Sequence, residues 1–442
     1  MTRAKSRLAA GRRRALLLAA LLPLLAHCAP AASRPEPVPP PAAGAAARGA
    51  SPALVPDAAL QALIDPYPAQ SGPSWLGGDV ASSIRLAHDR WVWIFGDTLL
   101  GTLRGDCAAR GGECRREVGG PGAGMIANSA GTMVRGPDGS FYPVVKYWRI
   151  ADGAPAPILA TDEEGFLWPL AGVRVGAVLL LAANRHTLDS GLLPFGNHLV
   201  RVFNPDAPPD LWLYDVQPLP GFVAATPERP LVSWTAALVH AGRFVYLVGS
   251  RDVGPDAVTV LGRIPSDDLV DAGWRPEPQF LVQEGDGARW ASPPSDPERL
   301  YVVPGLPGTS EAAIDFADGL GWYTFQIAAL RYEIRLYTAA DLLGPWTDRG
   351  VVYEIPAPWS TTTRGACPAP PPPDASPGEV PPACEHVYAA YAPKAHPELA
   401  NEGGHAVSYN VNVWSGGLDA AVRALETLPE FYVPRMLAAP GR

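Results

Sequence analysis

Charged residues are scarce in this chain of 442 residues: Asp, Glu, Lys and Arg make up 18%, against 47% hydrophobic residues. That balance excludes intrinsic disorder for most of the chain. Methionine is also rare, with 4 residues, whereas Trp, Tyr and Phe number 13, 14 and 11, a composition that favours strands over helices. Helical periodicity is convincing only at residues 418–428 (LDAAVRALETL). A long helical bundle is therefore excluded.

The sequence signatures of several enzyme classes are missing. The chain has no glycine-rich phosphate loop, no Gly-x-Ser-x-Gly turn and no EF-hand loop. It also lacks Cys-x-x-Cys and His-x-x-x-His spacings, and His186, His198 and His405 are dispersed. We therefore predict neither a cofactor nor a metal ion.

The first 27 residues have the pattern of a signal peptide. Six basic side chains precede an apolar run at residues 15–26, which is too short to span a bilayer. The run leads into Leu25-Ala26-His27-Cys28, which resembles a bacterial lipobox, although His27 departs from the small residue usual before the cysteine. We expect a protein of the bacterial cell envelope, lipid-anchored through Cys28; a soluble periplasmic or secreted protein is the alternative.

Acidic residues dominate once this segment is set aside. The first 27 residues contain no acid, so the remainder has an acidic excess of about fifteen. This excess argues against nucleic acid as a partner and against any membrane contact other than the lipid anchor. A neutral ligand or a cation fits better.

Cysteine is sparse, and its number is odd: Cys28, Cys107, Cys114, Cys367 and Cys384. If Cys28 carries a lipid, the other four fall into two local pairs, Cys107 with Cys114 and Cys367 with Cys384. Each pair would close a short loop as a disulfide in an oxidising compartment. The alternative is four independent thiols.

Composition divides the chain into three parts. Residues 30–56 hold eight Pro and nine Ala in 27 positions, so we predict an extended tether over residues 28–64, after the signal peptide at 1–27. No comparable linker interrupts residues 65–434, which predicts one domain. Within it, the Pro-rich stretch 367–384 has the composition of an insertion. We expect a monomer.

Short apolar runs, each followed by a turn and an aromatic-rich run, recur through this domain. Each instance is typical of an antiparallel hairpin. The instances are residues 83–97, 131–145, 168–185, 236–250 and 312–327. Hairpins at such intervals predict an all-β fold, a single five-bladed β-propeller, with six blades or a β-sandwich as alternatives. The expected inner strands are residues 79–86, 126–134, 168–173, 235–239 and 310–316.

Two aspartates flank the first hairpin. Asp79 begins its first strand and Asp97 ends its second, so both are expected at the same open end. Trp93 and Phe95 precede Asp97 at alternate positions, and their apolar surroundings would raise the pKa of a carboxyl group. We assign Asp97 as the general acid and Asp79 as the base; the structural alternative is that both aspartates bond backbone amides.

The segments around these aspartates resemble a known family. Residues 77–83 (GGDVASS) and 91–98 (WVWIFGDT) are similar to the opening of the five-bladed propellers called domain of unknown function 4185, although Val80 replaces a Gly and Ser82 a Tyr. Further similar segments follow in order at residues 125–129, 166–169, 342–346, 396–399 and 408–412. The layout also resembles propeller glycosidases that act on furanosides. The resemblance implies an inverting hydrolase of arabinofuranose polymers whose essential pair matches Asp79 and Asp97.

Four further residues are candidates for substrate binding. Glu311 begins an expected inner strand and could be a third carboxylate. Asn128 and Asn410 could bond sugar hydroxyls, and Trp168 could stack on a sugar ring. Each also has an ordinary structural alternative: a solvated charge, a turn or core packing.

Three functions remain open on these residues. The first is an exported, glycoside hydrolase-like propeller acting on a furanoside-containing polysaccharide. The second is a non-catalytic lipoprotein that binds a glycan or another envelope partner. The third is an envelope scaffold with a degenerate site. The replacements of the family's Gly by Val80 and of its Tyr by Ser82 are consistent with such a site.

Overall fold

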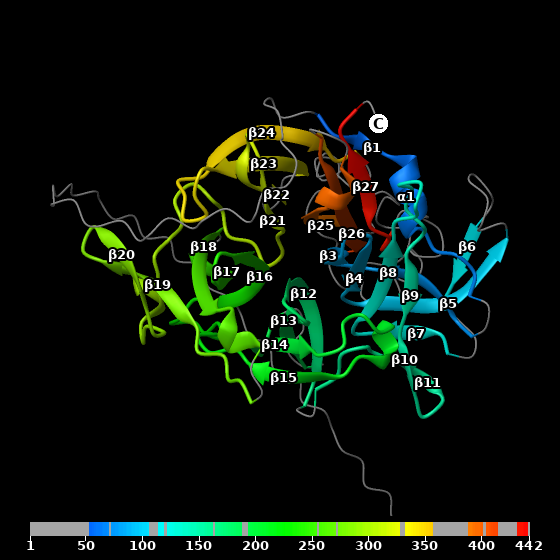
Figure 1. Ribbon diagram of the computed structural model, residues 1–442, viewed down its shortest axis with the longest axis horizontal. Coiled ribbons are helices and arrows are strands. Elements are labelled where there is room, and N and C mark those ends of the chain that lie inside the picture. The colour runs from blue at the N-terminus through cyan, green and yellow to red at the C-terminus, as the bar shows by residue number, and fades with distance from the viewer. Residues whose placement is uncertain are drawn as a thin grey trace, which may run out of the picture.

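The computed structural model describes residues 53–69, 72–105, 114–118, 122–161, 164–187, 193–253, 256–270, 273–327, 332–356, 388–400, 404–413 and 431–440. Strands dominate the regular structure of these residues (Figure 1), which confirms the predicted all-β class. Within the same ranges α1 (Ala58–Ile64) is the only α-helix, and no helix is long and apolar enough to cross a membrane. Short 3-10 turns are η1 (Pro209–Leu211), η2 (Asp267–Leu269), η3 (Pro297–Arg299) and η6 (Pro397–Leu399).

Five antiparallel sheets of four or five strands make up most of the molecule. The first contains β3 (Ser82–Ala87), β4 (Arg90–Phe95), β8 (Ser129–Val134) and β9 (Val145–Tyr147). The second contains β12 (Phe166–Val175), β13 (Val178–His186), β14 (Gly196–Val202) and β15 (Tyr214–Pro218). The third contains β16 (Val232–Ala241), β17 (Phe244–Val253), β18 (Asp256–Pro265), β19 (Gln279–Glu284) and β20 (Gly287–Ala291). The fourth contains β21 (Ile314–Ala317), β22 (Gly321–Ile327), β23 (Glu333–Ala339) and β24 (Thr347–Glu354).

The fifth sheet joins the two ends of the described chain. Its strands are β25 (Tyr388–Ala395), β26 (Ala406–Val413), β27 (Arg435–Ala438) and β1 (Val55–Pro56), and β1 pairs with β27. Two further sheets lie outside the five. One has four strands, β2 (Ser74–Gly78), β5 (Thr98–Gly105), β6 (Cys114–Glu117) and β7 (Gly124–Ile126), and the other pairs β10 (Arg149–Ala151) with β11 (Ala154–Ala156). Pairing of the first strand with the last fixes the ends of the domain against each other.

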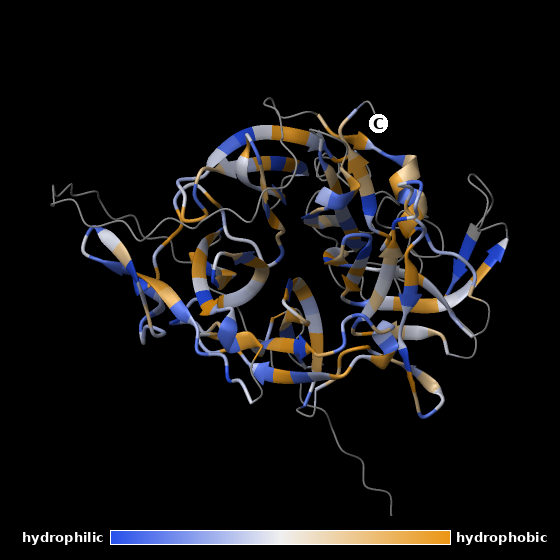
Figure 2. Cartoon of the chain, in the orientation of Figure 1, coloured by the Kyte–Doolittle hydropathy of each residue, from blue (hydrophilic) through white to orange (hydrophobic). Residues whose placement is uncertain are grey.

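The hydrophobic cores lie between neighbouring sheets and connect them in a cycle. Each of five clusters of buried residues draws mainly on two sheets: first with second, second with third, third with fourth, fourth with fifth, and fifth with first. The sheets accordingly surround a common centre (Figure 1), and apolar residues are distributed along their strands (Figure 2). This radial arrangement is typical of a β-propeller and differs from the two-layer packing of a sandwich.

All five predicted hairpins are antiparallel strand pairs. Glycines with positive φ make two of the tight turns, Gly176 at 57° and Gly242 at 58°. One of the expected inner strands was wrong, however. Residues 129–134 form β8, which is the third strand of its sheet, and the inner strand of the fifth sheet is β25. Lys394 of β25 reaches residues on two other inner strands or beside them, as described for the site below.

The folded part of the chain begins before the end of the predicted tether. Asp57 caps α1, because its side chain accepts hydrogen bonds from the backbone of Ala59 and Leu60. Leu60 and Ile64 are buried among the side chains of the first and fifth sheets. Residues 55–64 were therefore wrongly included in the tether: their alanine and proline content concealed a strand and a capped helix.

Several sequence-based expectations concern residues outside the described ranges. These are the signal peptide, Cys28, Cys107, Cys367, Cys384, the insertion at 367–384 and the helix at 418–428. Cys114 begins β6, but its side chain is likewise not described. The lipid anchor and both disulfides stay predictions.

Candidate active site

Asp79 and Asp97 lie side by side at one end of the β3–β4 hairpin. Asp79 precedes β3 by three residues and Asp97 follows β4 by two. The backbone N–H of Asp79 donates to the carbonyl of Asp97 at 3.3 Å, and the N–H of Gly96 donates to the carbonyl of Asp79 at 3.1 Å. These contacts confirm that both aspartates are at the same end of the hairpin.

The backbone directly after Asp79 is unusual. Val80 and Ala81 have φ angles of 67° and 49°, in the left-handed region that favours glycine. A β-branched residue in that region costs on the order of 1–3 kcal/mol. Glycine adopts positive φ without this strain, so Val80 is an unfavourable residue for its conformation.

Two tyrosines and a glycine surround the Asp79 carboxyl group. Tyr391 and Tyr432 donate hydrogen bonds to Oδ2 at 3.0 and 3.4 Å. Oδ1 is buried without a hydrogen-bond partner among the described residues, and a Cβ added to Gly96 would lie 2.3 Å from it. Burial, followed by the charges of Asp97 and Glu311, raises the pKa of Asp79 well above its usual value. These effects favour the protonated form of Asp79.

Asp97 is held by Trp168 of β12. The indole Nε1 of Trp168 donates to Asp97 Oδ1 at 2.6 Å, and the ring of His186 lies 3.9 Å from the tryptophan ring, centroid to centroid. Burial raises the pKa of Asp97 to about 7, while the indole hydrogen bond opposes this shift. Asp97 can therefore change protonation state near neutral pH.

Glu311 approaches from the segment before β21. Burial raises its pKa, and the ammonium group of Lys394 counteracts this effect. Because Asp97 and Glu311 both contribute to the raised pKa of Asp79, the three carboxyl groups lie near enough to interact electrostatically. We call Asp79, Asp97 and Glu311 the carboxyl cluster; each residue is half-buried, although Asp79 Oδ1 and Glu311 Oε2 are themselves buried.

Lys394 bridges the inner strands beneath the cluster. Its side chain is fully buried, and Nζ donates to the carbonyl of Leu170 on β12 at 3.0 Å and to that of Ala312 before β21 at 2.8 Å. Burial lowers the pKa of Lys394 to about 8, although the charges of Glu311 and Asp79 oppose the shift. The buried ammonium therefore favours the ionised form of Glu311.

The two asparagines differ in their relation to the cluster. Asn128 is fully buried, and its amide donates to the carbonyls of Leu159 and Leu167 and accepts from the N–H of Leu159. It therefore joins the segment at Leu159 to β12, and the expected substrate contact was wrong. Asn410 is also buried; its Nδ2 donates at 3.2 Å to the carbonyl of Gly78, directly before Asp79, so it positions the backbone of the site.

Sequence reasoning missed Tyr391, Tyr432 and Lys394. The sequence does contain one signal for the lysine, which is a lone cation in the otherwise uncharged run at residues 387–396 (VYAAYAPKAH). A cation inside an apolar strand is rarely buried unless it is paired. No comparable pattern distinguishes the two tyrosines from core aromatics.

The arrangement brings together carboxyl groups that hold and release protons near neutral pH. Such groups can act as a general acid and a general base on one substrate. Among the described residues, no group of three or more His, Cys, Asp and Glu side chains is placed to hold a metal ion. The chemistry that this site supports is therefore proton transfer between carboxyl groups and a polar substrate.

A ring of antiparallel sheets with a carboxyl cluster at one end of its inner strands defines a propeller-like all-β protein. The family described as Domain of unknown function (DUF5005) matches residues 65–433, and the chain belongs to this family. The resemblance to domain of unknown function 4185 was therefore wrong at the level of the family. No curated protein matches the chain.

A protein of Bacteroides ovatus, provisionally named a hydrolase, has a solved structure that matches with a TM-score of 0.60 and 15% identity, over 87% of this chain and 89% of that one. At this identity the match concerns the fold alone. An α-L-arabinanase of Cellvibrio cellulosa matches with a TM-score of 0.39 and 12% identity, over 81% and 90%. The catalytic domain of a family 62 α-L-arabinofuranosidase of Coprinopsis cinerea matches with a TM-score of 0.39 and 10% identity, over 88% and 96%.

Proposed function

We propose that this chain is a five-bladed propeller glycoside hydrolase that acts on a furanoside-containing polysaccharide. The observation that carries the proposal is the carboxyl cluster, in which the half-buried residues Asp79, Asp97 and Glu311 have raised pKa values and the charges of Asp97 and Glu311 act on Asp79. Glycoside hydrolysis needs one carboxyl group that is protonated and one that is ionised at the same pH. Three coupled carboxyl groups with different surroundings supply that combination.

In the proposed inverting reaction, one carboxyl group donates a proton to the departing glycosidic oxygen as the bond from that oxygen to the anomeric carbon breaks. A second carboxylate removes a proton from the water whose oxygen forms the new bond to that carbon. The charges around the cluster favour Asp79 as the acid and Asp97 as the base, the reverse of the division expected from the sequence. Glu311 supports the acid, because its charge helps Asp79 to keep its proton.

The direct test is hydrolysis of a panel of arabinans, galactans and fructans by the purified full chain, measured as release of reducing sugar. Asp97→Asn should remove the activity while the circular dichroism spectrum stays unchanged. If the wild-type chain releases no sugar from any polysaccharide of the panel, the enzymatic proposal fails. If Asp97→Asn is as active as the wild type, Asp97 has no part in the reaction.

One observation favours a second candidate function, a non-catalytic glycan-binding propeller. A cavity of about 740 Å³ is lined by later residues of the inner strands and does not include the carboxyl cluster. A cavity that does not include the acids could bind a glycan that the protein does not cleave. Saccharide binding with no hydrolysis by the wild-type chain would support this candidate over the enzyme.

For location, we propose export and anchoring through a lipid on Cys28. The proposal rests on the basic segment, the apolar run and the cysteine that follows it. Replacing Cys28 with Ser should move the protein from the membrane fraction to the soluble fraction of the cells that express it. Retention of Cys28→Ser in the membrane fraction would refute the anchor.

A further inference from the structure

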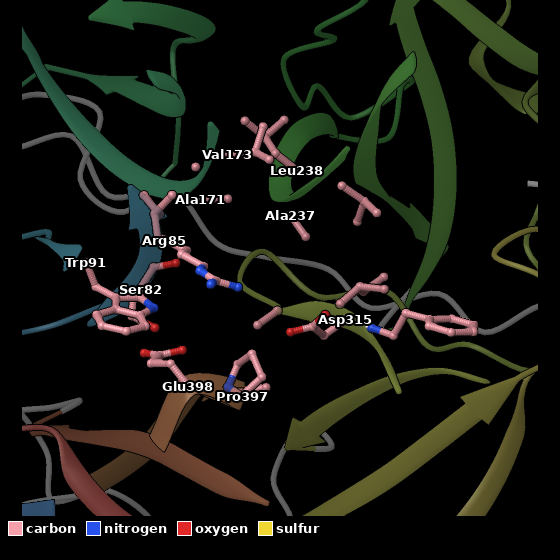
Figure 3. A pocket seen from close by; sticks show the side chains of 18 of the residues that line it. Ser82, Arg85, Trp91, Ala171, Val173, Ala237, Leu238, Asp315, Pro397 and Glu398 are labelled. Atoms are coloured by element: carbon pink, nitrogen blue, oxygen red, sulfur yellow. Dashed lines mark hydrogen bonds between the residues drawn. The ribbon is translucent and has the colours of Figure 1, made fainter. Parts of the chain in front are cut away.

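The cavity beside the carboxyl cluster is built from the same inner strands. Its walls include Arg85 on β3, Val173 on β12, Leu238 on β16, Asp315 on β21 and Glu398 on η6 (Figure 3). Its volume, about 740 Å³, lies within the range of about 300–1,000 Å³ that is typical of small-molecule sites.

The cavity begins beside the cluster and extends away from it along the inner strands. Ala312, the residue after Glu311, and Ala171 on β12 already line it. Val173 lies five residues beyond Trp168, and Asp315 lies four residues beyond Glu311, which corresponds to roughly 13–17 Å along the strands at about 3.3 Å per residue. The far part of the cavity is therefore distinct from the cluster.

Glu398 presents a buried acceptor atom to the cavity. Its side chain is only 7% exposed, and Oε1 is buried without a hydrogen-bond partner among the described residues. Nδ1 of His396 is 3.9 Å from Oε1 and bonds with the Ser83 hydroxyl at 2.8 Å. The Ser83 hydroxyl also lies close enough to lower the pKa of Glu398 by hydrogen bonding, so Oε1 is the one oxygen of this carboxyl group for which no partner is found among the described residues. An unpaired buried acceptor costs free energy, which a ligand with a hydroxyl donor would recover.

Donors and further acceptors line the rest of the cavity. Arg85 is exposed, and its Nε donates to the carbonyl of Ala87 at 3.1 Å, which leaves the terminal nitrogens for other partners. In Figure 3 its guanidinium extends from β3 into the cavity, toward the side where Asp315 lies. Asp315 uses Oδ1 to accept the backbone N–H of Phe316 at 2.7 Å. The Phe316 ring is half-buried and also lines the cavity.

This lining selects a ligand by its chemistry. Side chains of both charge signs are present, so neither a cation nor an anion is favoured as such. Apolar walls from Val173 and Leu238, a half-buried aromatic ring, a donor and two acceptors together suit a neutral ring compound with many hydroxyl groups. Each hydroxyl of such a compound can both donate to a carboxylate and accept from a guanidinium.

We propose that this cavity is a second saccharide-binding site, in which Glu398 and Asp315 accept hydrogen bonds from sugar hydroxyls and Arg85 donates to them. The site would hold a polysaccharide chain in the part of the cavity away from the carboxyl cluster. It does not require the cluster to be catalytic.

Calorimetric titration of the full-length Asp97→Asn chain with arabinotriose, galactotriose and a fructan trisaccharide tests the proposal. Asp97→Asn is used so that the ligand survives the titration. In this background Val173→Trp should fill the cavity and weaken the binding of at least one trisaccharide tenfold or more. Val253→Trp, at a position 46% exposed on β17, is the matched control and should leave binding unchanged. Glu398→Gln is the smaller change, in case the Val173→Trp chain does not fold, and should weaken the same ligand severalfold.

The outcomes separate this site from the proposed enzyme. Weakened binding in Val173→Trp or Glu398→Gln, but not in Val253→Trp, supports the second site whether or not the wild-type chain hydrolyses any polysaccharide. The proposal is overturned if no trisaccharide of the three binds at millimolar concentration, or if the folded cavity variants bind as tightly as the control. If the wild-type chain hydrolyses a polysaccharide and either of those two results is obtained, sugar binds at the carboxyl cluster and not in the cavity.

Discussion

The two ends of the inner strands carry acids in different surroundings. At the first end, the charges of Asp97 and Glu311 add to burial in raising the pKa of Asp79. At the second end, Asp315 and Glu398 line an open cavity, and burial raises their pKa values to about 6 and about 7, with a smaller contribution from Asp315 to the pKa of Glu398. Burial is the largest cause at both ends, but only at the first end do two acids act on a third, which favours a proton donor beside a proton acceptor. This difference points to chemistry at the first end and binding at the second.

One strand separates the two environments. Lys394 and His396 are alternate residues of the segment that begins in β25, and both are fully buried. The lysine favours ionisation of Glu311, while burial and the lysine charge lower the pKa of His396 to about 3, so that this ring stays neutral. The charge of Lys394 therefore favours ionisation in the cluster, while His396 stays uncharged on the side toward the cavity.

The largest loss of activity is expected at the carboxyl cluster, where substitutions of Asp79 and Asp97 distinguish the acid from the base. Asp79→Asn removes the proposed acid, so polysaccharide hydrolysis should fall by roughly 10³-fold, within the usual contribution of general acid catalysis. An aryl furanoside whose leaving group needs no proton should still be hydrolysed, with a loss of about tenfold or less. Asp97→Asn removes the base and should abolish hydrolysis of both substrates. The kcat/KM values for the two substrates provide the measurement.

Asp286→Asn is the matched control, because Asp286 lies exposed in the turn between β19 and β20. It should leave both rates unchanged. Equal losses on the two substrates for Asp79→Asn would contradict its role as the acid. An intact aryl activity in Asp97→Asn would instead assign Asp97 as the acid and Asp79 as the base, as expected from the sequence.

A smaller loss is expected when only the position of the Asp79 carboxyl group changes. In Gly96→Ala the new methyl group would lie 2.3 Å from Asp79 Oδ1, so the carboxyl group must move. A displacement of this size should lower kcat roughly 10–100-fold. At Gly196 an added Cβ meets only the His198 ring at 3.6 Å, an ordinary contact, so Gly196→Ala should retain the wild-type rate. A wild-type rate in Gly96→Ala would show that the exact position of this carboxyl group does not matter.

The hairpins and the aspartate pair could be predicted because they depend on local sequence. Alternating apolar residues and turn glycines specify each hairpin, and Asp79 and Asp97 flank the same one. The rest of the site depends on contacts between distant residues. Tyr391 and Tyr432 are 312 and 353 positions from Asp79, and no local pattern encodes such a contact.

The errors have the same physical origin. Asn128 beside a turn has the sequence context of a binding residue, but its amide is satisfied by backbone groups of Leu159 and of Leu167 on β12. The strand at residues 55–56 was assigned to the tether because its partner, β27, begins 380 residues later at Arg435. Composition describes a short segment accurately only when its partner is nearby in the sequence.

A still smaller effect is expected in the pH profile of the cluster. If Asp97 is the base, kcat/KM should fall as the pH drops below its pKa of about 7, because the protonated form cannot accept a proton. The Trp168 indole lowers that pKa through its hydrogen bond at 2.6 Å. Trp168→Phe removes the donor and should move the acidic limb upward by roughly one pH unit. A lower rate with an unmoved limb would assign Trp168 to substrate contact or packing instead.

The smallest effect is expected at the cavity end, on stability and not on the rate. Burial raises the pKa of Glu398 to about 7, so the folded state binds a proton that the unfolded state has released. Its stability should therefore decrease as the pH rises from about 4.5 through 7. Glu398→Gln mimics the protonated form and should raise the free energy of unfolding by about 1–3 kcal/mol at pH 8, with little change at pH 4.5. Urea denaturation at the two pH values measures the difference, and Glu277→Gln at an exposed position is the control. An equal gain at both pH values would mean that packing, and not ionisation, distinguishes Gln from Glu in the cavity.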